Sequence, residues 1–229
     1  MPDASPNPEL LRSLGRLVRG LSALFWGLPL ALIICVQTVR AAWFRNFNIV
    51  PPLIVTGLLY YGLWLIGDFQ KQERPWRRTL DAAKLVALVN FGLSPFLYWT
   101  SRVPHNFFLQ SVVVVLMLSG LLFLLSLNSV LLRLGAMLPD ETLRHETRLF
   151  TTVNRSLLMA LLLFIAIYLS LAMIPNLPMG VVMVLGWLGE NPLAILFILI
   201  FLALLPLAMT MALIWKTKEV ILESVFGPK

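Results

Sequence analysis

Three polar residues that could do chemistry lie close together in one apolar stretch of the chain. Asn90, Ser94 and Tyr98 are four residues apart, which places them on one side of a helix. Polar side chains in a membrane usually face protein or water. The stripe predicts either a polar path or ligand contact open to the outside, or hydrogen bonds between helices. Pro95 predicts a bend here, with Ser94 satisfying the carbonyl that proline frees.

Catalytic and metal-binding signals are weak elsewhere. Glu190 is the only acidic residue on the predicted outer side, where it is expected to cap a helix, with a catalytic or ion-binding role as the alternative. His105 and His145 fall on opposite predicted faces of the membrane, so they cannot share a metal or haem. HExxH, GxSxG and GxxxxGK[ST] motifs are missing. We therefore predict no catalytic residue, cofactor or metal, and the sequence leans against an enzyme.

The elements that position these residues follow from composition, because 59% of the 229 residues are hydrophobic and only 13% are charged. Apolar stretches of 18 to 26 residues occur six times, each long enough to cross about 30 Å of hydrocarbon. Backbone groups in lipid must be satisfied internally, so the stretches are predicted to be helices. Their limits are 21–39, 49–67, 83–100, 107–132, 156–174 and 193–215. The predicted fold class is an all-α polytopic transmembrane bundle of about six spans.

The domain organisation places this transmembrane domain at 21–215, between a cytoplasmic segment 1–20 and a cytoplasmic tail 216–229. Residues 9–20 alternate leucines with three arginines at helical spacing. They predict an amphipathic helix in the membrane interface. Its arginines, which we expect to contact anionic headgroups, are Arg12, Arg16 and Arg19. A further apolar segment at 179–188 is too short to span and predicts an interfacial or re-entrant helix.

The distribution of basic residues predicts the orientation. Alternate segments between the spans hold 15 Lys and Arg on one face and 3 on the other. Basic residues collect on the cytoplasmic side, so both termini are predicted to be cytoplasmic. This bias explains most of the net charge of +7 without a nucleic-acid partner. The short loops favour a bacterial cytoplasmic membrane.

Two cytoplasmic connections are candidate contact segments. Residues 133–155 predict either a docking helix for a partner subunit, with His145 as a pH-sensitive member, or a solvated helix that continues into the fifth span. Residues 68–82 predict either a lipid-headgroup or partner contact, or ordinary cytoplasmic anchoring. The second segment carries Trp76, Arg77 and Arg78.

Two asparagines receive no functional prediction. Asn128 lies near the inner end of the fourth span, where packing is the expected role. Asn154 begins a glycosylation sequence, Asn154-Arg155-Ser156, but is predicted to be cytoplasmic.

The leading functional hypothesis is a non-catalytic accessory or scaffold subunit of a membrane complex. Its expected partners are membrane lipids and other membrane protein subunits. The alternative is a small transporter or channel with a polar path along the third span, including Glu190 near the outer mouth. A third hypothesis is a lipid-handling enzyme with Glu190 or His105 as general base.

Overall fold

The computed structural model describes residues 8–40, 47–70, 72–137, 141–172 and 192–226. Regular structure in these residues is helical, which confirms the predicted all-α fold class. The helices are α1 (Pro8–Arg40), α2 (Val50–Ile66), α3 (Arg74–Leu93), α4 (Pro95–Arg102), α5 (Phe107–Met137), α6 (Glu141–Ala172) and α8 (Pro192–Phe226). Five helical stretches are long and apolar enough to cross a membrane, which is the architecture of a multi-pass membrane protein.

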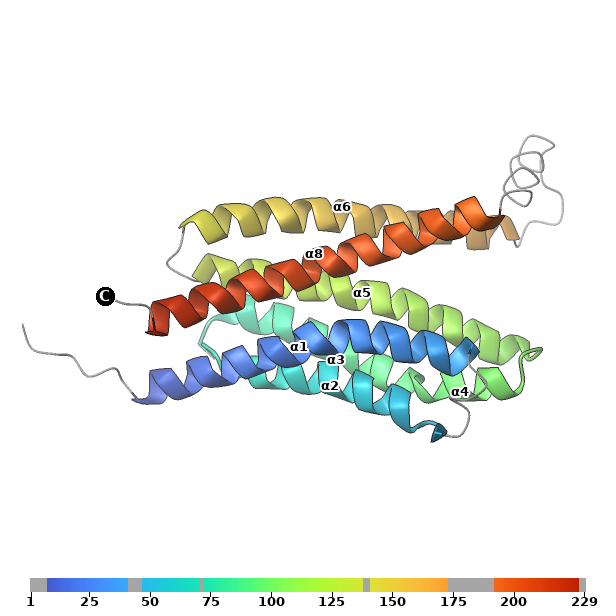
Figure 1. Cartoon of the computed structure of the whole chain (residues 1–229), viewed down its shortest axis with the longest axis horizontal. Helices are drawn as coiled ribbons and strands as arrows, with labels where there is room; N and C mark the ends of the chain where they lie inside the picture. The colour runs from blue at the N-terminus through green and yellow to red at the C-terminus, as the bar shows by residue number, and fades with distance from the viewer. Residues whose placement is uncertain (1–7, 41–46, 71, 138–140, 173–191, 227–229) are drawn as a thin grey trace, which may run out of the picture.

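The helices run lengthwise in one bundle, and the beginning of α1 and the end of α8 lie at the same end of it (Figure 1). α5 has 31 residues, which rise about 46 Å and exceed the hydrocarbon thickness of about 30 Å. α2, from the stretch predicted at 49–67, is the shorter apolar helix. Its 17 residues rise about 25 Å.

α1 and α2 approach each other closely because glycines lie at their contact. A Cβ on Gly20 would lie 2.8 Å from the carbonyl oxygen of Gly62. A Cβ on Gly62 would lie 3.1 Å from the carbonyl oxygen of Gly20. Small residues let two backbones come together in this way, so van der Waals contact runs along both helices.

The beginning of α1 differs from the expected separate interfacial helix over residues 9–20. α1 is one continuous helix that includes both this segment and the first predicted span. Leu17 and Leu21, on either side of the expected boundary, are both fully buried. Gly20, the last residue of the expected interfacial helix, lies inside α1 at the contact with α2.

The third span is divided into α3 and α4 at Ser94, next to Pro95, which is where the sequence predicts a bend. Proline has no N–H to donate to the carbonyl four residues earlier, that of Phe91. The Ser94 hydroxyl donates to this carbonyl at 2.9 Å, as the sequence predicted.

The apolar core lies mainly among α1, α2, α3 and α5, and it extends to α8. Its largest fully buried side chains are mostly leucines, and Trp76 is among them. The other members of this set are Leu17, Leu21, Leu24, Leu63, Ile66, Leu80, Leu127, Leu131 and Leu134. Burial of this kind comes from helix packing, since the outer faces of the same helices expose many apolar side chains.

Candidate functional site

The predicted stripe on the third span divides into a buried part and an outer part. Asn90 and Ser94 are buried, and the Ser94 hydroxyl accepts a hydrogen bond from Thr56 on α2 at 3.3 Å. Tyr98 is only partly buried. Its hydroxyl accepts from Nε of Arg102 at 3.0 Å, and the guanidinium lies 5.3 Å from its ring centroid. Tyr98 therefore interacts with the end of α4.

Asn90 is the residue of the stripe with an unsatisfied hydrogen-bond acceptor. Its Oδ1 is buried and receives no hydrogen bond within the described part of the chain. A buried acceptor without a donor is unfavourable by about 1–3 kcal/mol. This oxygen is the feature of the stripe that most resembles a ligand contact.

A second polar cluster, which we call the asparagine centre, joins α5, α6 and α8. It consists of Asn128, Asn154, Thr210 and the Pro206 carbonyl. The amide nitrogen of Asn154 lies 3.1 Å from Asn128 Oδ1, 2.9 Å from Thr210 Oγ1 and 3.2 Å from the Pro206 oxygen. The amide nitrogen of Asn128 lies 3.1 Å from Thr210 Oγ1. All three side chains are buried, so the centre fixes three helices at one level of the bundle.

Pro206 lies inside α8, and its carbonyl also accepts from the Thr210 hydroxyl at 2.8 Å. Asn154 Oδ1 has no hydrogen-bond donor in the described chain. The Asn154 side chain is fully buried, so the acceptor residue of the glycosylation sequence is not accessible in the folded chain. Sequence reasoning missed this centre. The available signal was one asparagine near the inner end of each of two neighbouring spans, together with a proline in the last span.

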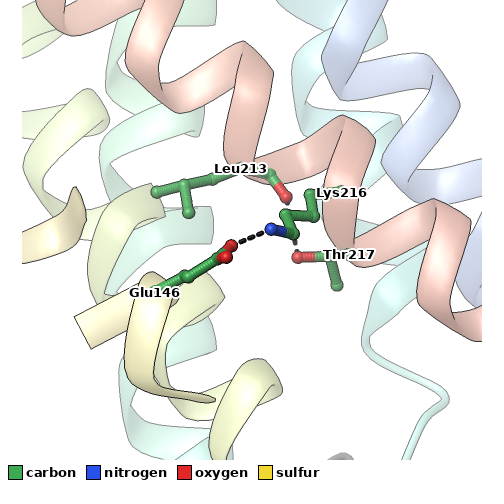
Figure 2. Close-up of polar contacts among 4 residues, drawn as sticks. All are labelled: Glu146, Leu213, Lys216 and Thr217. Atoms are coloured by element: carbon green, nitrogen blue, oxygen red, sulfur yellow. Dashed lines mark hydrogen bonds and ion pairs between the residues drawn. The ribbon is translucent and has the colours of Figure 1, made fainter. Parts of the chain in front are cut away.

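An ion pair joins α6 and α8 toward the end of the bundle where α8 terminates. The carboxylate of Glu146 and the ammonium of Lys216 point toward one another, as Figure 2 shows, and both are partly exposed. Thr217 is buried beside this pair and donates to the Leu213 carbonyl at 2.7 Å. His145, the predicted pH-sensitive residue, is exposed next to Glu146. The pair therefore links the predicted docking helix to the C-terminal helix.

The predicted contact segment 68–82 includes the turn after α2 and the beginning of α3. Trp76 is a core residue rather than an exposed anchor, because its side chain is 1% exposed and its Nε1 donates to the Phe69 carbonyl at 3.0 Å. Arg77 and Arg78 are exposed. A pocket of about 320 Å³ lies here, and Trp76 and Arg77 are among its lining residues.

The arginines predicted for the interface remain at the surface. Arg12, Arg16 and Arg19 are exposed along the first part of α1. Nη1 of Arg16 pairs with Oδ2 of Asp68 at 2.5 Å, so this side chain also ties α1 to the turn after α2. The lipid contact predicted for these arginines stays a prediction.

Two predicted features lie outside the described residues: Glu190 and the segment 179–188. His105 is described and exposed. Among the described residues, no group of three or more His, Cys, Asp or Glu is arranged to hold a metal ion.

Known proteins add no functional information to this geometry. No protein-family model, curated protein or solved structure matches the chain. The functional argument therefore depends on the chain's own contacts.

Proposed function

We propose that the chain is a non-catalytic accessory or scaffold subunit of a membrane complex. The observation that supports this is that several of its buried polar side chains form hydrogen bonds between helices. Asn128, Asn154 and Thr210 bond to one another across three helices. Ser94 bonds to Thr56 across two. Such bonds hold membrane helices together, which is the role expected of a scaffold.

The exposed side of α6 is where the proposal places a partner. α6 packs against α5 and α8 and lies at the edge of the bundle (Figure 1). Asn154 and its buried neighbours occupy one side of the helix. The opposite side exposes Leu163 by 63% and Ile167 by 50%. Transmembrane helices associate by packing such surfaces, so we propose that a partner's helix covers these two residues.

Co-purification tests the proposal. The tagged chain is extracted in mild detergent, and the recovered proteins are identified and quantified by mass spectrometry. We expect one or more partners at fixed stoichiometry, and their loss from the Leu163→Ala/Ile167→Ala double variant. Val115→Ala/Leu122→Ala is the matched control, since these residues are 51% and 47% exposed on α5. A chain that is recovered alone and shows turnover or transport would refute the proposal.

A transporter is the second candidate, and two buried oxygens favour it. Oδ1 of Asn90 and Oδ1 of Asn154 both lack a donor within the described helices, and a passing solute could supply one. The test is a flux assay in liposomes with candidate solutes. Transport that falls in the Asn90→Leu/Tyr98→Phe double variant would support this candidate. Any flux that the double variant leaves unchanged would exclude a path along the third span.

For the location, we propose a bacterial cytoplasmic membrane with both termini inside. The unequal division of 15 and 3 basic residues supports the orientation. The beginning of α1 and the end of α8 lie at one end of the bundle, which is compatible with it (Figure 1). Reporter fusions at each terminus test it, and an extracytoplasmic signal from either would contradict it.

A further inference from the structure

The pocket at the turn between α2 and α3 has the composition of a headgroup site. Its walls combine two indole rings with two cationic and two acidic side chains. The lining residues are Trp64, Gly67, Asp68, Trp76, Arg77, Leu80, Asp81 and Lys84. We propose that the pocket binds the zwitterionic headgroup of a phosphoethanolamine-type phospholipid. This inference goes beyond the accessory role, because a scaffold, a transporter or an enzyme could each use such a site.

Two neighbouring charges on α3, those of Asp81 and Lys84, lie in the same order as the two charges of that headgroup. Arg77, Asp81 and Lys84 follow one another at spacings of four and three, on one side of the helix. Lys84 lies furthest along α3 toward the apolar part of the bundle, and Asp81 lies about 4.5 Å closer to the helix start. A lipid phosphate lies nearer the hydrocarbon than the ammonium group. Lys84 is thus placed for the phosphate and Asp81 for the ammonium.

The charges of the pocket on α3 are close to one another but are not paired in the described helices. Within the described part of the chain, Arg77, Asp81 and Lys84 form no ion pair. Asp68 differs, because Arg16 pairs with it at 2.5 Å. Asp81 therefore remains as the carboxylate for a cationic group, and Lys84 remains as the cation for a phosphate.

The ammonium group of Lys84 lies against the end of α2. A Cβ added to Gly67 would lie 2.6 Å from the Lys84 ammonium nitrogen, so the cation lies directly beside the C-cap of α2. A positive charge is favourable at a helix C-terminus. The glycine leaves the space that the ammonium occupies, and a phosphate reaching the pocket meets a cation already in place.

The pocket borders a surface of exposed aromatic and apolar side chains on α2. Trp64 is 56% exposed, and Tyr61 stacks beside it with ring centroids 6.3 Å apart. Ile54, two turns from Tyr61, is exposed on the same side. Tryptophan and tyrosine favour the level of lipid headgroups. A lipid held at Lys84 and Asp81 would lay its acyl chains along this apolar surface.

Native mass spectrometry of the full-length chain in mild detergent tests the site. The delipidated protein is titrated with phosphatidylethanolamine, phosphatidylglycerol and phosphatidylcholine. We expect the ethanolamine lipid to bind best, because phosphoglycerol lacks the cation and methylated choline cannot donate to Asp81. Lys84→Gln should weaken ethanolamine-lipid binding roughly fivefold, the effect of one basic residue near a lipid headgroup. Asp81→Asn should weaken binding of the ethanolamine lipid but not that of phosphatidylglycerol, because the lost carboxylate repels an anionic headgroup.

Arg78→Gln is the matched control, since Arg78 is exposed on the same helix but does not line the pocket. Equal weakening by Arg78→Gln and Lys84→Gln would show general charge attraction and overturn the proposal, as would a preference for phosphatidylglycerol. If Lys84→Gln unfolds, Asp81→Asn decides in its place. Soluble phosphoethanolamine or inorganic phosphate that competes as well as the lipid would assign the site to a free phosphate compound and overturn the lipid assignment. None of these outcomes depends on co-purifying subunits, so this test and that of the accessory role can fail separately.

Discussion

The two sides of the bundle are held together by different forces. α1 and α2 meet through Gly20 and Gly62, and leucines fill the space around them. α6 joins α5 and α8 through the asparagine centre. Close packing is distributed over many atoms, whereas the centre depends on a few directional bonds. We infer that the α1–α2 side is rigid, and that the α6–α8 side can be altered by changing single polar groups.

The largest expected effect is at the glycine contact. Gly20→Val places side-chain carbons where the Gly62 oxygen and Ile66 lie, and should lower the free energy of unfolding by about 3 kcal/mol. Gly92→Val is the control, because a Cβ at Gly92 meets nothing within 4 Å. Unfolding in mixed detergent micelles measures both. Equal effects of the two variants would show that α1 and α2 are not closely packed at Gly20.

A smaller but still large effect is expected at the asparagine centre. Asn154→Ala removes the described donor to Asn128 Oδ1 and should lower the free energy of unfolding by about 2 kcal/mol. Ser156→Ala, an exposed change on the same helix, should have little effect. The Asn128→Ala/Asn154→Ala double variant sharpens the test, since bonded residues give non-additive losses. Additive losses would contradict a shared network.

A substitution at the junction of α3 and α4 should lower the free energy of unfolding by less than one at the asparagine centre. Ser94→Ala removes the bonds to the Phe91 carbonyl and to Thr56, and should lower the free energy of unfolding by about 1 kcal/mol. Thr79→Ala is a comparison on α3, where the hydroxyl donates to the Pro75 and Trp76 carbonyls within one helix. The same micelle titration measures both. A loss at Ser94 no larger than that at Thr79 would mean that the contact between α2 and Ser94 contributes nothing.

The smallest expected effect is at the ion pair between α6 and α8. Glu146→Gln should lower the free energy of unfolding by about 0.5 kcal/mol, because both charged side chains are more than 40% exposed. The loss should diminish as salt is added, since exposed charges are screened. A larger, salt-independent loss would show that the pair is shielded, for example by a bound partner.

The sequence predicted the helices of the bundle but not the polar contacts between them. Apolar length was sufficient for the five long apolar helices, and Pro95 with Ser94 was sufficient for the helix interruption and its compensating bond. The asparagine centre depends on which helices are neighbours, and residues 26 and 56 positions apart supply its bonds. The burial of Trp76 likewise depends on the fold of the turn around it, so its position beside two arginines favoured an exposed contact. Local pattern therefore predicted elements, and packing decided which polar groups meet.

The most direct test of the accessory role is the composition of the native particle. The tagged chain is extracted from its own membrane in lipid nanodiscs without detergent, and native mass spectrometry gives the mass and identity of each protein in the particle. The account predicts a particle in which this chain is joined by at least one other membrane protein at fixed stoichiometry. A particle that contains only this chain, and that transports a solute or converts a lipid by itself, would contradict it.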